Sequence, residues 1–395
     1  MLSPSKSAPA ILILTHNYVR FPGDHAGLFV HIVAKGLVQA GRKVLVLAPH
    51  QKGLKTSETM DGVVVYRFRY APAGKERLAY LGNMHELVAR SWVNKFLFLS
   101  FLMAFLLRSL GLLIRKRIDL IWAQWWIPGG FIGWIVSLLG RKPLIVTSHG
   151  TDIRILEKTG LSSRVAGLVY RRARHVTTVS TFLKEKLIKS VRLEPERVKT
   201  IPMPVTPEVF KPTPLKNNGV KLILCVARFT PQKGLGFFLD ACKILNDKGI
   251  NFQAKIVGEG PLRNSLQEQI KKLNLKDRVV LADIMPQEKL NLLYEESYLC
   301  ILPSLDEGFG LVLVEAQLCR RPVIGTRSGG ITDIIEDGQS GILVPPQDHV
   351  SLATAMERIL TDHNLASRLA EGGYQSAMAK FSPQAVSHKY LEVLR

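Results

Sequence analysis

The chain has 395 residues, which is enough for two domains that each bury a core. Hydrophobic residues make up 47% of the sequence, and this content excludes a largely disordered protein. The formal net charge is +21, but residues 1–205 carry 31 Lys and Arg against 11 Asp and Glu, whereas the remainder carries 22 against 21. This asymmetry indicates that the first half meets an anionic partner such as phospholipid, a lipid phosphate or nucleic acid; a merely solubilising surface is the alternative.

The cysteines indicate a reducing compartment. No Cys-x-x-Cys spacing occurs among the four, which are Cys225, Cys242, Cys300 and Cys319. Buried free thiols are therefore expected, without a metal site. The first ten residues contain no long apolar stretch behind a basic cap, so no signal peptide is expected and the predicted location is the cytoplasm.

Short apolar runs that alternate with helical segments predict a doubly wound α/β domain in the first half. A strand over 10–18 is followed by a helix over 27–40, and the later strand candidates span 42–49, 63–70, 119–125, 143–150 and 175–180. A proline-rich stretch near 202–218 then separates a second series of strands, over 221–229, 252–258, 278–283, 298–304, 321–326 and 341–346. The predicted division is an N-terminal domain over 1–204, a linker over 205–218 and a C-terminal domain over 219–380.

One segment departs from this alternation of strands and helices. From Phe96 to Ile114 the only charged residue is Arg108, and three basic residues follow at 115–117. The length is at the threshold of a membrane span, yet a predicted strand follows at once. Three interpretations stay open: a helix packed on the N-terminal sheet, a helix lying in the membrane interface, or a transmembrane span.

The spacing of two glutamates and two cations predicts a ligand site in the second half. Glu307 and Glu315 have seven residues between them, and Arg228 and Lys233 follow the first strand of this half. A turn that leads into a helix lets these four side chains converge, with Glu315 about two turns into the helix. Glycines after Glu307 allow close backbone approach, and the helix start offers free N–H groups to an anion. Such a set suits a phosphorylated sugar.

Six segments in order carry a family resemblance: FPGDHAGLFVHIVAKGL, SHGTDI, VARFTPQKGL, IVGEGPLR, the two glutamates, and SGGITDIIEDGQSGILVPP. The chain resembles the retaining, group 1 glycosyltransferases of family 4. The resemblance implies the α/β GT-B fold, in which two Rossmann-like domains have parallel sheets facing across a donor/acceptor cleft. It also implies that residues 381–395 form a C-terminal helix that returns to the N-terminal domain.

The resemblance assigns the donor side to the C-terminal domain. Arg228 and Lys233 match cations that bind the donor diphosphate and stabilise the charge of the leaving nucleotide. Glu307 matches the residue that holds the transferred sugar, and Glu315 matches the one that accepts the ribose hydroxyls. The remaining donor-binding positions are Gly27, Gly308, Phe309, Gly310 and Leu311.

The acceptor side is assigned to the N-terminal domain. His149 follows the strand PLIVT and matches the histidine at the reaction centre, while Asp152 is expected to shape its loop. Gly23 belongs to the early loop before the first helix. The residues implied in catalysis are thus His149, Glu307, Arg228 and Lys233.

Three parts of the chain depart from the family pattern. The interdomain stretch is Pro202 to Thr206, where the family has proline, asparagine, glycine, a hydrophobic residue and aspartate. Arg320 and Arg321 follow Cys319 in place of a glycine, which is expected to alter only the surface. Ala282 replaces a glycine near the nucleotide base, so the base preference stays open.

The sequence therefore predicts a retaining glycosyltransferase that moves a sugar from a nucleotide-diphosphate sugar to an acceptor hydroxyl. A lipid-linked or anionic acceptor, in cell-surface glycan or glycolipid synthesis, would use the excess positive charge, and would place the enzyme peripherally on the inner face of the cell membrane. No cofactor or metal is expected, and nucleic acid is disfavoured because no basic stretch is interleaved with aromatics. The alternatives are a non-catalytic basic membrane-binding module on the same scaffold and a nucleotide-sugar epimerase.

Overall fold

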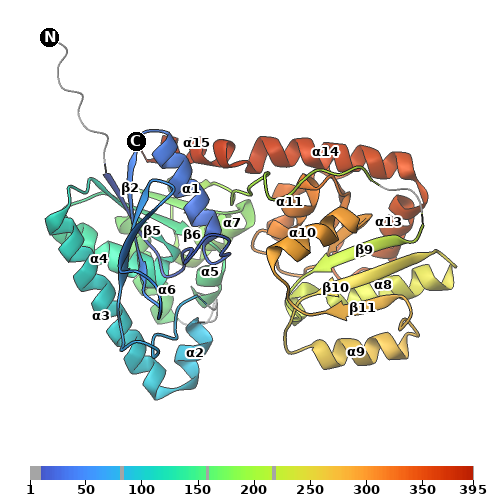
Figure 1. The fold of residues 1–395 in the computed structure, drawn as a ribbon, viewed down its shortest axis with the longest axis horizontal. Helices are drawn as coiled ribbons and strands as arrows, with labels where there is room; N and C mark the ends of the chain where they lie inside the picture. Colours follow the sequence, from blue (N-terminus) through green and yellow to red (C-terminus); the bar gives the residue numbers. More distant parts are fainter. Residues whose placement is uncertain (1–9, 81–83, 157–159, 216–218, 395) are drawn as a thin grey trace, which may run out of the picture. The chain divides into compact units, whose positions relative to one another are not determined.

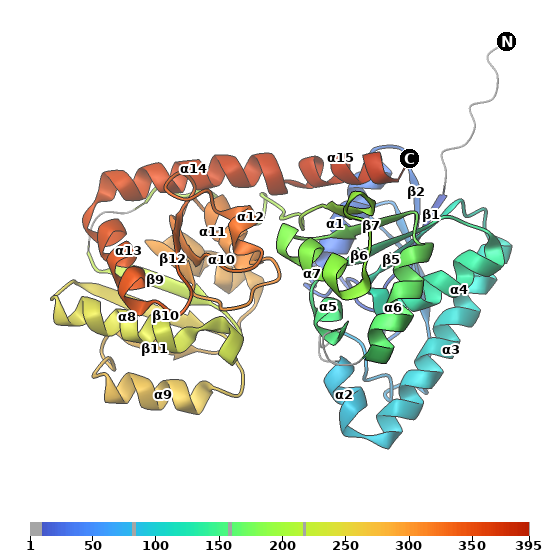
Figure 2. The same ribbon diagram turned by 180° about the vertical axis from the view of Figure 1, so that it is seen from behind.

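The computed structural model describes residues 10–80, 84–156, 160–215 and 219–394. The chain divides into two compact units, residues 1–204 with 386–395 and residues 205–385, which we call the N-terminal and C-terminal units. Each unit is an α/β layer structure whose sheet is covered by helices (Figures 1 and 2). The predicted α/β class with two parallel sheets is confirmed, apart from one antiparallel edge strand.

The sheet of the N-terminal unit has eight strands in the order β3-β4-β2-β1-β5-β6-β7-β8. Strand β3 is antiparallel to β4 and all other pairings are parallel. The strands span Ala10–Leu14 (β1), Lys43–Pro49 (β2), Ser57–Met60 (β3), Val63–Phe68 (β4), Leu120–Gln124 (β5), Leu144–Ser148 (β6), His175–Thr178 (β7) and Val198–Thr200 (β8). Sequence analysis did not predict β3 and β8, because both are short edge strands without an apolar run.

The helices of this unit are α1 (Leu28–Gln39), α2 (Met84–Arg90), α3 (Trp92–Arg115), α4 (Phe131–Gly140), α5 (Thr151–Leu156), α6 (Gly160–Arg172) and α7 (Thr181–Val191). Helix α15 (Pro383–Val393) adds Val386, Tyr390 and Val393 to the same buried core. The ring of Tyr390 packs on that of Trp122 with centroids 4.7 Å apart. The end of the chain thus completes the core of the N-terminal unit.

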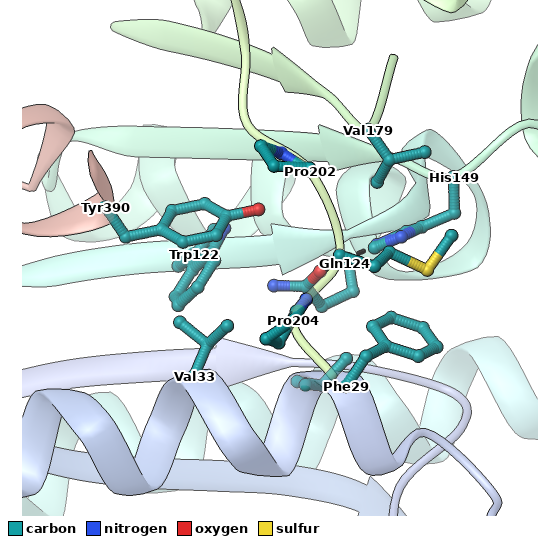
Figure 3. A pocket seen from close by; sticks show the side chains of 11 residues that line it. Phe29, Val33, Trp122, Gln124, His149, Val179, Pro202, Pro204 and Tyr390 are labelled. Carbon is teal, nitrogen blue, oxygen red and sulfur yellow. Dashed lines mark hydrogen bonds between the residues drawn. The ribbon is translucent and has the colours of Figure 1, made fainter. Parts of the chain in front are cut away.

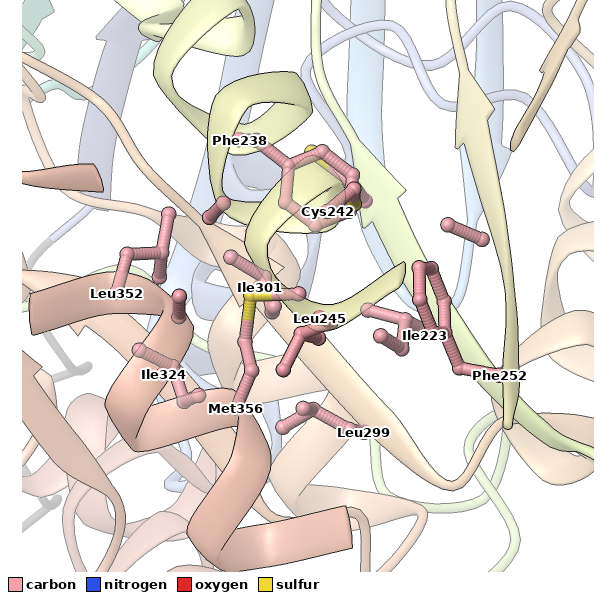
Figure 4. Close-up of a cluster of buried hydrophobic side chains, with 14 of the residues drawn as sticks. Ile223, Phe238, Cys242, Leu245, Phe252, Leu299, Ile301, Ile324, Leu352 and Met356 are labelled. Carbon is pink, nitrogen blue, oxygen red and sulfur yellow. The ribbon is translucent and has the colours of Figure 1, made fainter. Parts of the chain in front are cut away.

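The sheet of the C-terminal unit has six parallel strands in the order β11-β10-β9-β12-β13-β14. They span Lys221–Val226 (β9), Phe252–Val257 (β10), Val279–Ala282 (β11), Leu299–Leu302 (β12), Val323–Thr326 (β13) and Ile342–Val344 (β14). The helices are α8 (Leu235–Asp247), α9 (Arg263–Lys272), α10 (Gln287–Glu296), α11 (Leu311–Leu318), α12 (Ile331–Ile334), α13 (His349–Thr361) and α14 (His363–Phe381). Phe238 and Leu245 of α8 and Met356 of α13 pack on the strand side chains (Figure 4). All four cysteines are buried free thiols.

Each sheet has a point where the direction of strand addition reverses. In the N-terminal unit this point lies between β1 and β5, and in the C-terminal unit it lies between β9 and β12. The loops at the carboxyl ends of two such strands diverge to opposite faces, which leaves a crevice where open α/β sheets bind ligands. The residues after β1, β5, β9 and β12 are therefore the first to examine for a site.

The apolar segment after residue 91 forms one helix, α3, with two different faces. Phe101 and Phe105 are buried against the sheet, and the Phe105 ring stacks on Phe68 at 4.5 Å. On the other face, Phe96 and Leu107 are 71% and 62% exposed. By length and composition α3 could cross a membrane, although core helices of soluble proteins pass the same criterion. The packed stripe agrees with the first of the three interpretations, and the exposed apolar face leaves the interfacial one in place.

The expectation that Arg320 and Arg321 alter only the surface is wrong for Arg321. Arg321 is buried, and its guanidinium donates hydrogen bonds to the carbonyls of Cys319, Ser297 and Thr213 at 3.0, 3.1 and 2.6 Å. Arg320, by contrast, is partly exposed beside Glu371. A planar, five-donor guanidinium can satisfy several carbonyls at once, so Arg321 ties the segment before β9 to the turns that precede β12 and β13.

We therefore expect Arg321→Met to lower the free energy of unfolding of the C-terminal unit by about 2–4 kcal/mol, because two buried carbonyls and a partly buried one lose a charged donor. The matched variant Arg320→Met should cost less than about 1 kcal/mol, since its ion pair is exposed. Urea unfolding followed by circular dichroism measures both. Equal losses for the two variants would contradict the structural role given to Arg321.

Candidate active site

Two loops meet at the carboxyl edge of the C-terminal sheet. The loop after β9 carries Arg228 and Lys233, and the loop after β12 carries Glu307. The backbone N–H of Leu305 donates to the carbonyl of Gln232 at 2.7 Å. Gly234 has φ +61°, and a Cβ there would lie 2.1 Å from the carbonyl oxygen of Pro303. Only glycine permits this approach, so it fixes one loop against the other.

This approach brings the predicted cation and carboxylate into contact. The Lys233 ammonium lies 2.5 Å from a carboxylate oxygen of Glu307, which also accepts a hydrogen bond from the Ser304 hydroxyl at 3.2 Å. The side chains of Lys233 and Glu307 are 17% and 12% exposed, so both reach the surface of the site. Arg228 is exposed, and within the described part of the chain its guanidinium has no ion pair. The pair thus presents one positive and one negative group to a ligand, with a second cation nearby in sequence.

Glu315 lies in helix α11, which follows the loop that carries Glu307. It is the fifth residue of α11, about one turn into the helix instead of the expected two. Its carboxylate accepts a hydrogen bond from the hydroxyl of Tyr294 at 2.8 Å. Burial raises the pKa of Glu315 to about 7, and the hydrogen bond from Tyr294 opposes this rise. Among the described contacts, none joins Glu315 or Arg228 to the Lys233–Glu307 pair.

The segment 308–311 has the backbone features that the sequence predicted. Phe309 is buried, and its ring packs on Phe381 at 5.6 Å, so its side chain anchors the loop and only its backbone is available to a ligand. Gly310 has φ +102° and precedes Leu311, the first residue of α11. No described side chain caps this helix, and the N–H of Leu313 donates to the carbonyl of Gly310 at 2.9 Å, so the N–H groups of Leu311 and Val312 are the ones open to an anion. This helix start therefore offers backbone donors at the carboxyl edge of the sheet, on the loop that also carries Glu307.

The N-terminal unit places His149 directly after β6. Nε2 of His149 lies 2.9 Å from Oε1 of Gln124, while Nδ1 is buried without a hydrogen-bond partner in the described protein. The ring packs on Trp125 and Phe29 at 4.4 and 4.9 Å. Burial lowers the pKa of His149 to about 3, so the imidazole is neutral at physiological pH. With Oε1 of Gln124 accepting from Nε2–H, Nδ1 presents a lone pair.

Asp152 positions the loops and is itself turned toward the backbone. One carboxylate oxygen accepts from the N–H groups of His149 and Gly150 at 3.1 and 3.0 Å, and the other accepts from the N–H of Trp126 at 3.2 Å. Burial raises the pKa of Asp152, and these backbone donors oppose the rise. Asp152 thus joins the loop after β5 to the loop after β6 and sets the direction of His149.

The two early glycines differ in what they allow. Gly27 is the N-cap of α1 with φ +65°, and a Cβ there would lie 2.3 Å from the carbonyl oxygen of Asn17. Gly23 has φ +84° but is exposed, and a Cβ there would meet no atom within 4 Å. Gly27 therefore brings the start of α1 against the loop after β1, whereas at Gly23 only the positive φ favours glycine.

His149 also borders a small cavity of about 10 Å³, which is enough for about one water molecule (Figure 3). Pro202 and Pro204 line it together with Tyr390 and Phe29. The departure from the family pattern at 202–204 thus lies beside His149 within the N-terminal unit. The cavity itself is too small for a sugar.

Sequence analysis missed three residues of the two sites, which are His16, Trp125 and Tyr294. His16 and Trp125 follow β1 and β5, the strands at the reversal point, and their rings pack at 4.4 Å. Trp125 has φ +59° and contacts His149 as well. Tyr294 was hidden because it comes from α10, far from Glu315 in the sequence. The only sequence signal for Trp125 was its place at the end of a predicted parallel strand.

Known proteins resemble both units. Residues 208–376 match the family model described as glycosyl transferases group 1, and residues 26–204 match the one described as a glycosyl transferase 4-like domain. The α-D-kanosaminyltransferase of Streptomyces kanamyceticus is 28% identical over 284 residues, which cover 67% of this chain and 73% of that protein. Sucrose-phosphate synthase of Thermosynechococcus elongatus has a TM-score of 0.78 at 22% identity and covers 98% of both chains. Anabaena HepE in complex with UDP-glucose has a TM-score of 0.72 at 22% identity, over 98% of this chain and 99% of that one.

If Glu315 accepts nucleotide hydroxyls, its pKa of about 7 makes nucleotide affinity depend on pH. The carboxylate forms as pH rises from 6 to 8, so affinity should rise over this interval. Tyr294→Phe removes the hydrogen bond that favours the carboxylate, and should move the midpoint to higher pH. Titration calorimetry with UDP, GDP and ADP, using whichever binds best, measures this.

Glu315→Gln is the control, because the phosphate of the nucleotide also titrates in this range. The variant should keep only the phosphate contribution and lose the rest of the pH dependence. Identical pH profiles for Glu315→Gln and the unaltered chain would rule out the role given to Glu315.

Proposed function

Because this chain belongs to the group 1 glycosyltransferases and transfers a sugar from a nucleotide sugar, we propose that the transfer retains the configuration of the sugar and that the acceptor is lipid-linked or anionic. Binding of the donor sugar nucleotide rests on one observation. This is the contact between Lys233 and Glu307 at the reversal point of the C-terminal sheet. Family membership sets aside the non-catalytic alternative. The epimerase alternative would show itself as loss of donor without an acceptor.

We propose that Arg228, Lys233 and the start of α11 bind the diphosphate that leaves. Negative charge grows on the diphosphate as the bond to the sugar breaks, and donors fixed beforehand stabilise that charge without reorganisation. Lys233 is held by Glu307, and Arg228 has its guanidinium free of ion pairs among the described residues. Glu307 would hold a sugar hydroxyl, and Glu315 the ribose hydroxyls. Arg228, Lys233 and the helix start supply positive charge and N–H donors to the diphosphate, so we propose that transfer needs no metal or cofactor.

His149 is best suited to a hydrogen-bonding role in a retaining transfer. With a pKa near 3 it is a weak base, so it is poorly matched to removing the proton of an acceptor hydroxyl. The leaving phosphate would take that proton in an attack from the same face. The unpartnered Nδ1 of His149 would accept a hydrogen bond from a hydroxyl of the transferred sugar.

The acceptor proposal rests on the surface of the N-terminal unit. Phe96, Leu107 and Ile114 are exposed on α3, and Leu139 is exposed on α4, which packs beside α3. Exposed basic residues flank these helices at Lys95, Arg115, Lys116, Arg117, Arg141, Arg164 and Arg171. Arg172, in contrast, donates to the carbonyl of Ser137 and adds nothing to this surface. Apolar side chains bordered by cations suit the interface of an anionic bilayer, where each cation contributes about 1 kcal/mol. We propose the inner face of the cell membrane.

Lys233→Ala should lower kcat by about 10²–10³ at saturating donor, because the leaving diphosphate loses a fixed donor. Lys248→Ala is the matched control, since Lys248 forms a surface ion pair with Glu357 in the same unit. Turnover of UDP-, GDP- and ADP-sugars with and without EDTA measures both variants and tests the metal-free mechanism. Full activity of Lys233→Ala, or loss in EDTA that magnesium restores, would refute the respective assignment.

His149→Ala should lower kcat at least about tenfold, which corresponds to about 1.4 kcal/mol, while nucleotide affinity is kept. The melting temperature of the variant is measured alongside, because a ring buried between Trp125 and Phe29 also contributes packing. A variant that melts lower but turns over normally when folded would show His149 to be structural only.

The full chain should bind vesicles that contain phosphatidylglycerol more tightly than neutral phosphatidylcholine vesicles, and salt should weaken the binding. Phe96→Asp should reduce it, because a charge replaces an exposed apolar anchor. Leu292→Asp is the control, as Leu292 is 56% exposed on the C-terminal unit. Co-sedimentation measures the bound fraction. Equal binding to both vesicle types would remove the charge argument, and no binding to either would point to a soluble acceptor.

A further inference from the structure

A second and larger cavity lies in the N-terminal unit, at the carboxyl ends of β1, β5 and β6. Its volume is about 260 Å³, whereas about 10–15 Å³ suffices for a single water. The walls come from the loops after β1 and β5, from Leu78 and Tyr80 after β4, and from α2, α3 and α5. The cavity therefore occupies the reversal point of the N-terminal sheet, where ligands of open α/β sheets bind.

Most of the wall is apolar. The apolar lining residues are Leu78, Met84, Val88, Phe98, Ile127, Pro128 and Ile155. They come from five separate parts of the unit, so the apolar surface surrounds the space and is not a single helix face. Covering apolar surface is favourable by about 25 cal/mol per Å², so an apolar occupant gains stability here that a hydrated sugar does not.

The same cavity also has polar groups that lack partners. Nδ1 of His16 and Oδ1 of Asn17 are both buried and have no hydrogen-bond partner within the described protein. A buried polar atom left unpaired is costly, so both atoms favour a ligand that brings a hydroxyl donor. Burial also lowers the pKa of His16 to about 4, which leaves its ring neutral and able to accept. The cavity thus combines apolar walls with hydrogen-bond acceptors.

Trp125 connects this cavity to the reaction centre. Its ring lines the cavity, and it lies 4.4 Å from the ring of His16 and 4.4 Å from the ring of His149. A hydroxyl held at His16 is therefore one aromatic ring away from His149. On the opposite side, Phe98 lines the cavity from α3, the helix that exposes Phe96 and Leu99. The apolar wall and the exposed face thus belong to one helix.

We propose that this cavity binds the hydrocarbon part of the acceptor directly beside its reacting hydroxyl, so that the preferred acceptor is an amphipathic alcohol or glycolipid and not a free sugar. The inference rests on the proposed function, because it takes the occupant to be the acceptor. His16 and Asn17 receive the polar end, the side chains of α2, α3 and α5 enclose the hydrocarbon chain, and the Trp125 ring, which contacts both His16 and His149, joins the cavity to the reaction centre.

The test uses octyl β-D-glucoside below its micelle-forming concentration, with glucose as the comparison, on the full chain by titration calorimetry. We expect saturable binding to one site, at least about tenfold tighter than glucose. Ile155→Arg puts a charged chain into the wall and should weaken octyl glucoside binding at least tenfold. Met84→Ser is a milder variant that keeps the test decisive if Ile155→Arg does not fold, and it should weaken binding severalfold.

Leu292→Asp, on the surface of the C-terminal unit, should bind octyl glucoside as the unaltered chain does. Nucleoside diphosphate binding and vesicle binding are measured on the same preparations. No preference for octyl glucoside over glucose, or equal binding by the folded cavity variants, overturns the inference even where nucleotide and vesicle binding persist. If the unaltered chain binds no nucleoside diphosphate, the proposed function is overturned instead, so the two failures are distinct.

Discussion

The close approach of Gly234 to the carbonyl of Pro303 is the constraint on which the donor side depends. Two loops that follow neighbouring parallel strands must share one edge of the sheet, and a Cβ at this position would lie 2.1 Å from a carbonyl oxygen. Without that Cβ the loops close, and the Lys233 ammonium reaches the carboxylate of Glu307. Gly27 plays the same part in the N-terminal unit, where it brings the start of α1 against Asn17. In both units, backbone contact decides where the side chains converge.

The two units use charge differently. In the C-terminal unit, Arg228, Lys233 and Glu307 are charged groups near the surface, in a unit whose overall charge is almost balanced. The N-terminal unit carries nearly all the excess positive charge, yet His16 and His149 are neutral because burial lowers the pKa of each. The excess charge therefore lies on exposed side chains, outside the polar centre that His16 and His149 form. A charged diphosphate suits the first kind of site, and a neutral hydroxyl beside a hydrocarbon suits the second.

Helix α15, near the C-terminus, supports the sheet of the N-terminal unit. Tyr390 packs on Trp122 of β5, and Trp122 in turn donates its indole N–H to Thr147 of β6 at 2.8 Å. These are the two strands whose ends carry Trp125 and His149. A helix from the end of the sequence thus supports the strands beneath the polar centre, so that changes in α15 can affect residues more than 240 positions earlier in the chain.

The sequence by itself determined the fold class and the motif residues, because buried parallel strands are continuous apolar runs and because glycines and charges at strand ends are local signals. Lys233, Glu307 and Gly310 could be singled out in this way. Only the tertiary structure decided which groups surround them. Tyr294 reaches Glu315 from another helix, Trp125 lies between His16 and His149, and Arg321 turns inward to three carbonyls where a surface change was expected. These contacts join residues that are far apart in the chain. Burial, which sets the pKa values of Glu315 and His149, is likewise a property of the packed fold and not of any segment.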